Sequence, residues 1–205
     1  MRAFLLAAVL VAVATAAQAD PIDDQGYLIS CGDTDELGRG CTINASGFNL
    51  FVAEDGGTTP ALYAKLRALP PMSFVKFSGD MGDMGDVSAT LVLASFSPAD
   101  DINEGNLRAL QGQWSTTAPD APPLISVKGL DWSQLGPDDW EEVYMIVPGQ
   151  ECADGTPTTG TSLSLYPYGS DPVEVACWQI DAIEGDALTL RRGPAGAAVD
   201  YTRQK

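Results

Sequence analysis

Histidine is absent from this 205-residue sequence, and cysteine occurs only four times. Without histidine, the chain lacks the side chain that most often performs acid–base catalysis near neutral pH, and it lacks an imidazole ligand for metals. The sequence also has no C-x-x-C motif and no G-x-S-x-G motif, so the common cysteine spacing for zinc and the common setting of a hydrolase serine are both missing. These absences argue against an enzyme and against a metal or other cofactor.

Basic residues are scarce as well, because 11 Lys and Arg stand against 28 Asp and Glu, giving a formal net charge of −17. Such a field repels phosphate backbones and anionic lipid headgroups. The charge therefore argues against a nucleic-acid partner, and it favours solubility or a cationic partner.

The N-terminus has the pattern of a secretory signal peptide at residues 1–19. Met1-Arg2 supply a short positive region, residues 3–16 supply an apolar region, and Ala17-Gln18-Ala19 supply a small-x-small cleavage site. The apolar run is shorter than the roughly 20 residues that cross a bilayer, so we expect no membrane span after cleavage. The predicted location is the periplasm or the extracellular medium, for a mature chain whose charge falls from −17 to −18 with the loss of Arg2.

All four cysteines lie after this signal, and an even number in an exported chain indicates disulfides. Four cysteines allow three pairings. We favour Cys31 with Cys41 and Cys152 with Cys177, because each of these pairs lies within one half of the chain.

The mature chain is predicted to be mainly β and to form two small antiparallel barrel or meander domains, the first with one interior α-helix. A polar stretch with proline and glycine separates two patterned apolar regions. We therefore divide the chain into a first domain at 20–98, a linker at 99–106 and a second domain at 107–205.

The first half contains one helix among short strands. Thr59 can cap a helix that has Pro60 in its first position and ends before Pro70-Pro71. The predicted strands lie at 27–31, 48–52, 74–77 and 87–93. This arrangement resembles the small five-stranded barrels of the oligonucleotide/oligosaccharide-binding (OB) type, without the basic groove and stacking aromatics that nucleic-acid binding needs.

The last two of these strands are joined by residues 79–86, which we predict to be a long acidic loop. Asp80, Asp83 and Asp86 recur in it at every third residue. Calcium loops commonly place their ligands at every second residue, so a solvated turn is the preferred interpretation.

The second half opens with a short helical turn that runs into Gly112-x-Trp114. This opening is similar to that of lipocalin-like (calycin) barrels, in which a tryptophan closes one barrel end and a basic residue from a late strand covers it. The resemblance implies a structural closing role for Gly112 and Trp114 with Arg203 or Arg191. Together with a strand at Trp114, the predicted strands at 124–127, 140–147, 162–166, 174–183, 187–192 and 199–203 make about seven, against eight in a lipocalin.

Calycin barrels commonly hold a small apolar ligand or inhibit a partner through their open-end loops. The resemblance thus implies an exported, non-enzymatic binding or inhibitory module whose small-molecule or protein partner is unknown. Two alternatives remain, a structural or envelope-interaction protein without a pocket and a hydrolase that uses paired carboxylates. The aromatic residues that could line a pocket, or simply fill the core, are Trp132, Trp140, Tyr144, Trp178, Tyr166 and Tyr168.

Overall fold

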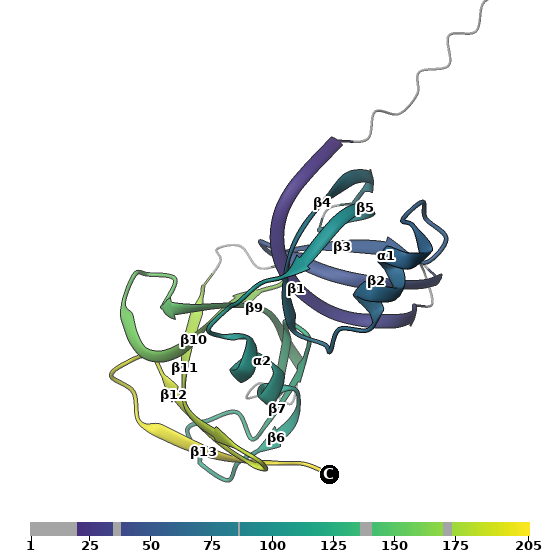
Figure 1. Cartoon of the computed structure of the whole chain (residues 1–205). Coiled ribbons are helices and arrows are strands. Elements are labelled where there is room, and N and C mark those ends of the chain that lie inside the picture. The colour runs from purple at the N-terminus through teal and green to yellow at the C-terminus, as the bar shows by residue number, and fades with distance from the viewer. Residues whose placement is uncertain (1–19, 35–37, 86, 136–140, 170–173) are drawn as a thin grey trace, which may run out of the picture.

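The computed structural model describes residues 20–34, 38–85, 87–135, 141–169 and 174–205. The fold is mainly β, as the sequence predicts, and the strands form two closed barrels that lie side by side (Figure 1). Within the described residues, no helix has the length and apolar character needed to cross a membrane. The predicted signal peptide at 1–19 lies outside the described residues.

The first barrel has five strands in the order β1-β2-β3-β5-β4, and β1 pairs with β4 to close it. All pairs are antiparallel except β3 with β5. One helix, α1, follows β3 and packs Tyr63 and Leu66 against the barrel core. The elements are β1 (Asp20–Thr34), β2 (Gly38–Ala45), β3 (Phe48–Ala53), α1 (Pro60–Arg67), β4 (Ser73–Met84) and β5 (Ser88–Pro98).

In this half the sequence analysis missed one strand, and one of its predictions was wrong. Strand β2 begins at Gly38 and was not among the predicted strands. The absence of a side chain at Gly40 leaves room for the ring of Phe51, since an added Cβ would lie 2.3 Å from its Cζ. The predicted acidic loop is largely strand, because β4 continues to Met84 and Asp80 pairs with Val92 of β5. Its acidic side chains do not prevent pairing because backbone groups make the ladder. The rest of that prediction, Asp86, lies outside the described residues.

Helix α1 begins at Pro60 as predicted, but the Thr59 side chain makes no capping hydrogen bond. The Thr59 carbonyl instead accepts the backbone N–H groups of Leu62 and Tyr63, each at 3.0 Å. The helix start therefore depends on the fixed backbone of proline at N1 rather than on a side-chain cap.

The second barrel is an antiparallel meander of eight strands, β6 to β13, closed by the pairing of β6 with β13. This number is one more than the sequence analysis found, because β8 was missed, and a closed barrel of eight strands is compatible with a lipocalin-like fold. The strands are β6 (Gly112–Ser115), β7 (Leu124–Lys128), β8 (Asp131–Leu135), β9 (Glu141–Glu151), β10 (Pro157–Pro167), β11 (Ala176–Glu184), β12 (Ala187–Arg192) and β13 (Ala198–Arg203).

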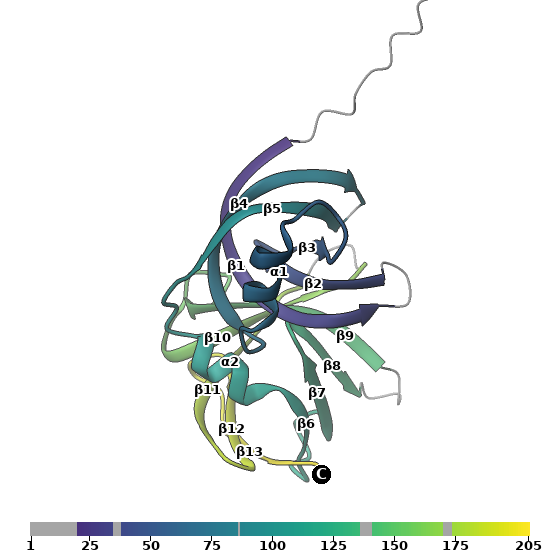
Figure 2. The same ribbon diagram turned by 45° about the vertical axis from the view of Figure 1, so that its right-hand side comes forward.

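A second helix, α2 (Glu104–Leu110), lies where the two barrels meet (Figure 2). Its Leu107 and Leu110 are fully buried in the core of the second barrel. Its opposite face contacts the first barrel, since Glu104 Oε2 accepts the backbone N–H of Phe74 at 3.3 Å and Arg108 Nε donates to the Pro71 carbonyl at 3.2 Å. Residues 104–106, which the sequence analysis placed in the linker, thus begin this helix.

The first barrel also contributes directly to the core of the second. Tyr27 of β1 and Met72, which precedes β4, are buried in the same hydrophobic cluster as Trp114. The Tyr27 hydroxyl donates to Asp101 Oδ1 at 2.6 Å, and the same oxygen accepts the Asn103 backbone N–H at 2.8 Å. The segment between the barrels is therefore held by hydrogen bonds as well as by apolar contact.

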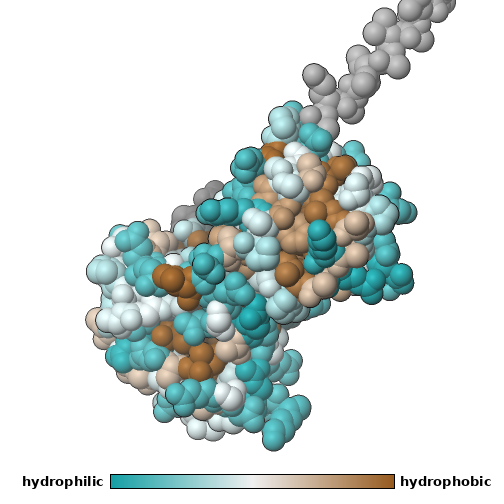
Figure 3. Space-filling model, in the orientation of Figure 1, coloured by the Kyte–Doolittle hydropathy of each residue, from teal (hydrophilic) through white to brown (hydrophobic). Residues whose placement is uncertain are grey.

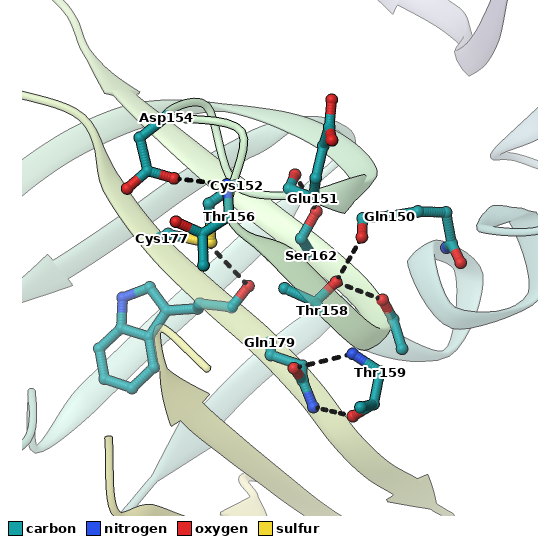
Figure 4. Close-up of a disulfide and its surroundings, with 12 residues drawn as sticks. Gln150, Glu151, Cys152, Asp154, Thr156, Thr158, Thr159, Ser162, Cys177 and Gln179 are labelled. Carbon is teal, nitrogen blue, oxygen red and sulfur yellow. Dashed lines mark hydrogen bonds between the residues drawn. A yellow bond between two sulfur atoms is a disulfide. The ribbon is translucent and has the colours of Figure 1, made fainter. Parts of the chain in front are cut away.

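Both predicted disulfides are confirmed, and among the described residues no cysteine is free. Cys31–Cys41 joins residues that face each other across β1 and β2. Cys152–Cys177 joins the turn after β9 to β11 (Figure 4). The same hairpin is held to β11 by Gln179, which accepts the Thr159 backbone N–H and donates to its hydroxyl.

Replacing the cysteines of each bridge by serine is expected to lower the free energy of unfolding unequally. The bridges span 25 and 10 residues, so removal restores more unfolded-chain entropy for Cys152–Cys177. Loop-closure entropy gives losses of about 3.5 kcal/mol for Cys152→Ser/Cys177→Ser and about 2.7 kcal/mol for Cys31→Ser/Cys41→Ser. Urea unfolding of the two double variants measures this, and the reverse order would contradict the expectation.

Alkaline pH is expected to weaken the junction through Tyr27. Burial, followed by the hydrogen bond to Asp101, raises the pKa of Tyr27 well above its usual value. In the unfolded chain this group titrates near pH 10, so above that pH the unfolded state loses a proton that the folded state keeps, and stability falls by about 1.4 kcal/mol per pH unit.

The variant Tyr27→Phe separates this effect from general alkaline unfolding. We expect it to be less stable at pH 7 by about 1 kcal/mol, because one hydrogen bond is lost. Between pH 10 and 11 its stability should fall less steeply than that of the wild type, as measured by urea unfolding at each pH. Parallel decline of the two proteins would show that Tyr27 titrates normally.

Candidate functional site

One end of the eight-stranded barrel is closed by Trp114 and Arg203. Trp114 is fully buried, and its Nε1 donates to the Leu110 carbonyl of α2 at 2.8 Å. The Arg203 guanidinium lies over the indole, 4.0 Å from the ring centroid, and donates to the carbonyls of Ala109 and Gln111. The Arg203 side chain thus packs on the indole face and also donates hydrogen bonds to carbonyls at the C-terminal end of α2. These contacts connect α2, β6 and β13.

Gly112 makes this close approach possible. Its φ of +112° lies in a region that favours glycine, and an added Cβ would be 2.9 Å from Arg203 Nη1. Arg191, the alternative candidate for covering Trp114, instead pairs with Asp181 at 2.7 Å. The structure thus places Gly112, Trp114 and Arg203 together, away from any open site.

At the opposite end of the barrel, the described residues leave the space between the strands uncovered. Side chains on the inner face change along the strands from apolar near α2 to polar near the opening, because alternate residues of a strand point to the same face. On β9 the inner residues are Ile146, then Tyr144, then Glu142, and on β12 they are Leu188, Leu190 and Arg192. The half of the barrel near α2 is filled by apolar side chains. The half near the opening is lined by polar and aromatic groups.

A cavity of about 1030 Å³ occupies this open half. Its floor includes Trp178, which stacks on Trp132 with ring centroids 6.2 Å apart. Apolar walls come from Leu165 and Ala176. The volume lies at the upper limit of the range found for sites of small organic molecules.

The wall of this cavity carries an ordered carboxylate at Glu142. Glu142 Oε2 accepts hydrogen bonds from Gln134 Nε2 and from the Tyr144 hydroxyl, both at 2.8 Å. Gln134 Oε1 in turn accepts the Trp132 indole N–H at 3.0 Å. Every hydrogen-bond donor in this series is neutral, and Arg192, the one cation among the described lining residues, forms no ion pair with Glu142.

The pKa of Tyr144 reflects the same partly buried environment beside Glu142. Burial, reinforced by the hydrogen bond to Glu142, raises the pKa of Tyr144 to about 12. The hydroxyl therefore remains a proton donor throughout the physiological range. It holds one oxygen of Glu142 and leaves the other, Oε1, with no hydrogen-bond partner among the described residues.

Charges around the cavity are mostly negative. Asp120, Glu142 and Glu174 line it, and Arg192 is the one basic residue among the described lining residues. Glu142 takes part in none of the ion pairs that the described residues form. The described part of the chain also places no group of three or more metal-ligating side chains together. The arrangement suits noncovalent binding of an organic molecule.

The pocket aromatics named from sequence have different positions. Trp178 and Tyr144 line the cavity, Trp132 is buried beneath it, and Trp140 lies outside the described residues. Sequence analysis missed Gln134, Glu142 and Arg192 as lining residues. Strand alternation carried the signal for Glu142, because it lies two residues before the inward-facing Tyr144.

Arg203 is expected to stabilise the fold through the closed end of the barrel. Arg203→Gln removes the cation over Trp114 and the donors to two helix carbonyls, which should cost about 2–4 kcal/mol. The matched control is Arg192→Gln at the open end, which should change stability by less than about 0.5 kcal/mol because Arg192 is exposed. Urea unfolding tests both variants, and equal losses would contradict the closing role.

Compared with known proteins, the chain matches no family model, no curated protein and no solved structure. The compatibility of its second barrel with a lipocalin-like fold is therefore one of architecture. Folds of this kind carry many unrelated functions, so function has to be argued from the cavity itself.

Proposed function

We propose that this protein is an exported, non-enzymatic binding module whose second barrel holds a small organic ligand in its open half. The observation that supports this function is the cavity of about 1030 Å³ between the Trp132–Trp178 pair and the barrel opening. Ligand sites generally combine apolar walls with a few positioned polar groups, and here Glu142 and Gln134 supply the polar part. The two disulfides fit an oxidising compartment.

A binding role also agrees with how the barrel is stabilised. The closed end buries Trp114 and the α2 leucines, so the open end can leave apolar surface uncovered without loss of the core. Cys152–Cys177 holds β11, the strand that carries Trp178 (Figure 4). The cavity thus rests on a rigid wall, which favours binding because little ordering is needed.

A second candidate is a surface-interaction role of the first barrel. Met84, Val87 and Val92 are exposed large apolar residues on or beside β4 and β5. Figure 3 shows the broadest apolar area of that view on the first barrel, with smaller patches on the second. Exposed apolar area of this kind is typical of protein contact sites, although it lacks the enclosure of the second barrel's cavity.

Filling the cavity is expected to prevent ligand binding. Ala176 lines the cavity, so Ala176→Trp inserts an indole into it, whereas Ala198→Trp adds the same side chain to the exposed outer face of β13 near the same end. Native mass spectrometry of protein from a periplasmic extract should detect a bound small molecule on the wild type and on Ala198→Trp. It should be absent from Ala176→Trp.

Two outcomes would contradict the proposal. A wild-type protein that is empty, with both disulfides intact, would favour the surface-interaction role. A ligand that survives Ala176→Trp would place binding elsewhere in the molecule.

A further inference from the structure

We propose that the cavity selects an organic cation: a primary or secondary ammonium group carried on a flat apolar body. This inference rests on the proposed function, and it names the ligand class of the same site. The ammonium binds Glu142 Oε1, and the apolar body lies on Trp178 between Leu165 and Ala176.

The hydrogen bonds of Glu142 give the first reason. Oε2 is saturated by two neutral donors, Gln134 and Tyr144, so the carboxylate cannot rotate freely. Oε1 is left as an acceptor in the wall of the cavity. A partly buried carboxylate that forms no ion pair among the described residues gains most from a ligand that supplies both a positive charge and an N–H donor.

The surrounding charges give the second reason. Acidic residues outnumber basic ones among the described lining residues, and the whole chain is strongly acidic. A mouth lined mainly by one sign of charge attracts the opposite sign and raises its association rate. An anionic ligand would be attracted by Arg192 but would be repelled by the carboxylates of Asp120, Glu142 and Glu174.

The aromatic groups give the third reason. Trp178 forms part of the floor, and Tyr144 stands beside Glu142 in the wall. An indole face accepts a flat apolar group and also attracts a nearby cation. One ligand of modest size can therefore pair with the charge of Glu142 and also stack on Trp178.

The test compares three probes of matched shape by isothermal titration calorimetry at pH 7. They are 2-(2-naphthyl)ethylammonium, the neutral 2-(2-naphthyl)ethanol and the anionic 3-(2-naphthyl)propanoate. We expect the ammonium to bind the wild type at least about tenfold more tightly than the alcohol, and the carboxylate to bind most weakly.

Three variants test which residues cause the preference for the ammonium over the alcohol. In Glu142→Gln, which keeps an acceptor for Gln134 and Tyr144, the ammonium should lose its advantage and bind no better than the alcohol. Glu141→Gln removes the same charge from the neighbouring exposed position on the outer face, and it should keep the preference. Arg192→Gln, which removes the one basic residue among the described lining residues, should strengthen ammonium binding relative to alcohol binding.

The outcomes separate the two proposals. If the alcohol binds as tightly as the ammonium, or if Glu142→Gln keeps the preference, the cavity binds ligands but the cation inference is wrong. A co-purified ligand without an amine would overturn it in the same way. If none of the probes binds and the native spectrum is empty, the binding function itself fails.

Discussion

The burial of α2 between the two barrels is the constraint on which the rest of the structure depends. One face of this seven-residue helix places Leu107 and Leu110 in the core of the second barrel, and the other face meets the first barrel through Glu104 and Arg108. A helix this short is not stable alone, so its position is set by these contacts. Trp114 and Arg203 complete the contact by binding the last carbonyls of the helix.

Closure at one end explains why the other end can be open. The apolar side chains that hold the barrel together lie toward α2, where Tyr27 and Met72 of the first half join them. Farther along the same strands, the inner face becomes aromatic at Trp132 and Trp178 and then polar at Glu142. A gradient of this kind places the cavity in the part of the barrel that contributes least to the core.

Much of the fold could be predicted because its patterns are local. Turn residues and strand alternation identified most strands, and the division of the cysteines between the halves identified both disulfides. Strand β2 was missed because Gly40, which looks like a loop residue, is required by the ring of Phe51 on the neighbouring strand. The predicted strand ended before the true end of β4, because the acidic residues there pair with β5 through backbone groups.

The site was harder to predict than the fold, because it is assembled across strands. Glu142 and Gln134 face each other across β8 and β9, and only that register turns two ordinary surface residue types into a hydrogen-bonded pair. Trp132 and Trp178 looked equivalent in sequence, yet one is buried beneath the cavity and the other forms its floor. Nothing in either residue's neighbours along the chain distinguishes these positions.

The most direct test of the account is a crystal structure of the protein, purified under native conditions so that any bound ligand is kept. The account predicts a closed end formed by α2, Trp114 and Arg203, and electron density for a small molecule that contacts both Trp178 and Glu142. A second barrel whose half near the opening is filled by its own side chains, with no space between Trp178 and Glu142, would contradict it.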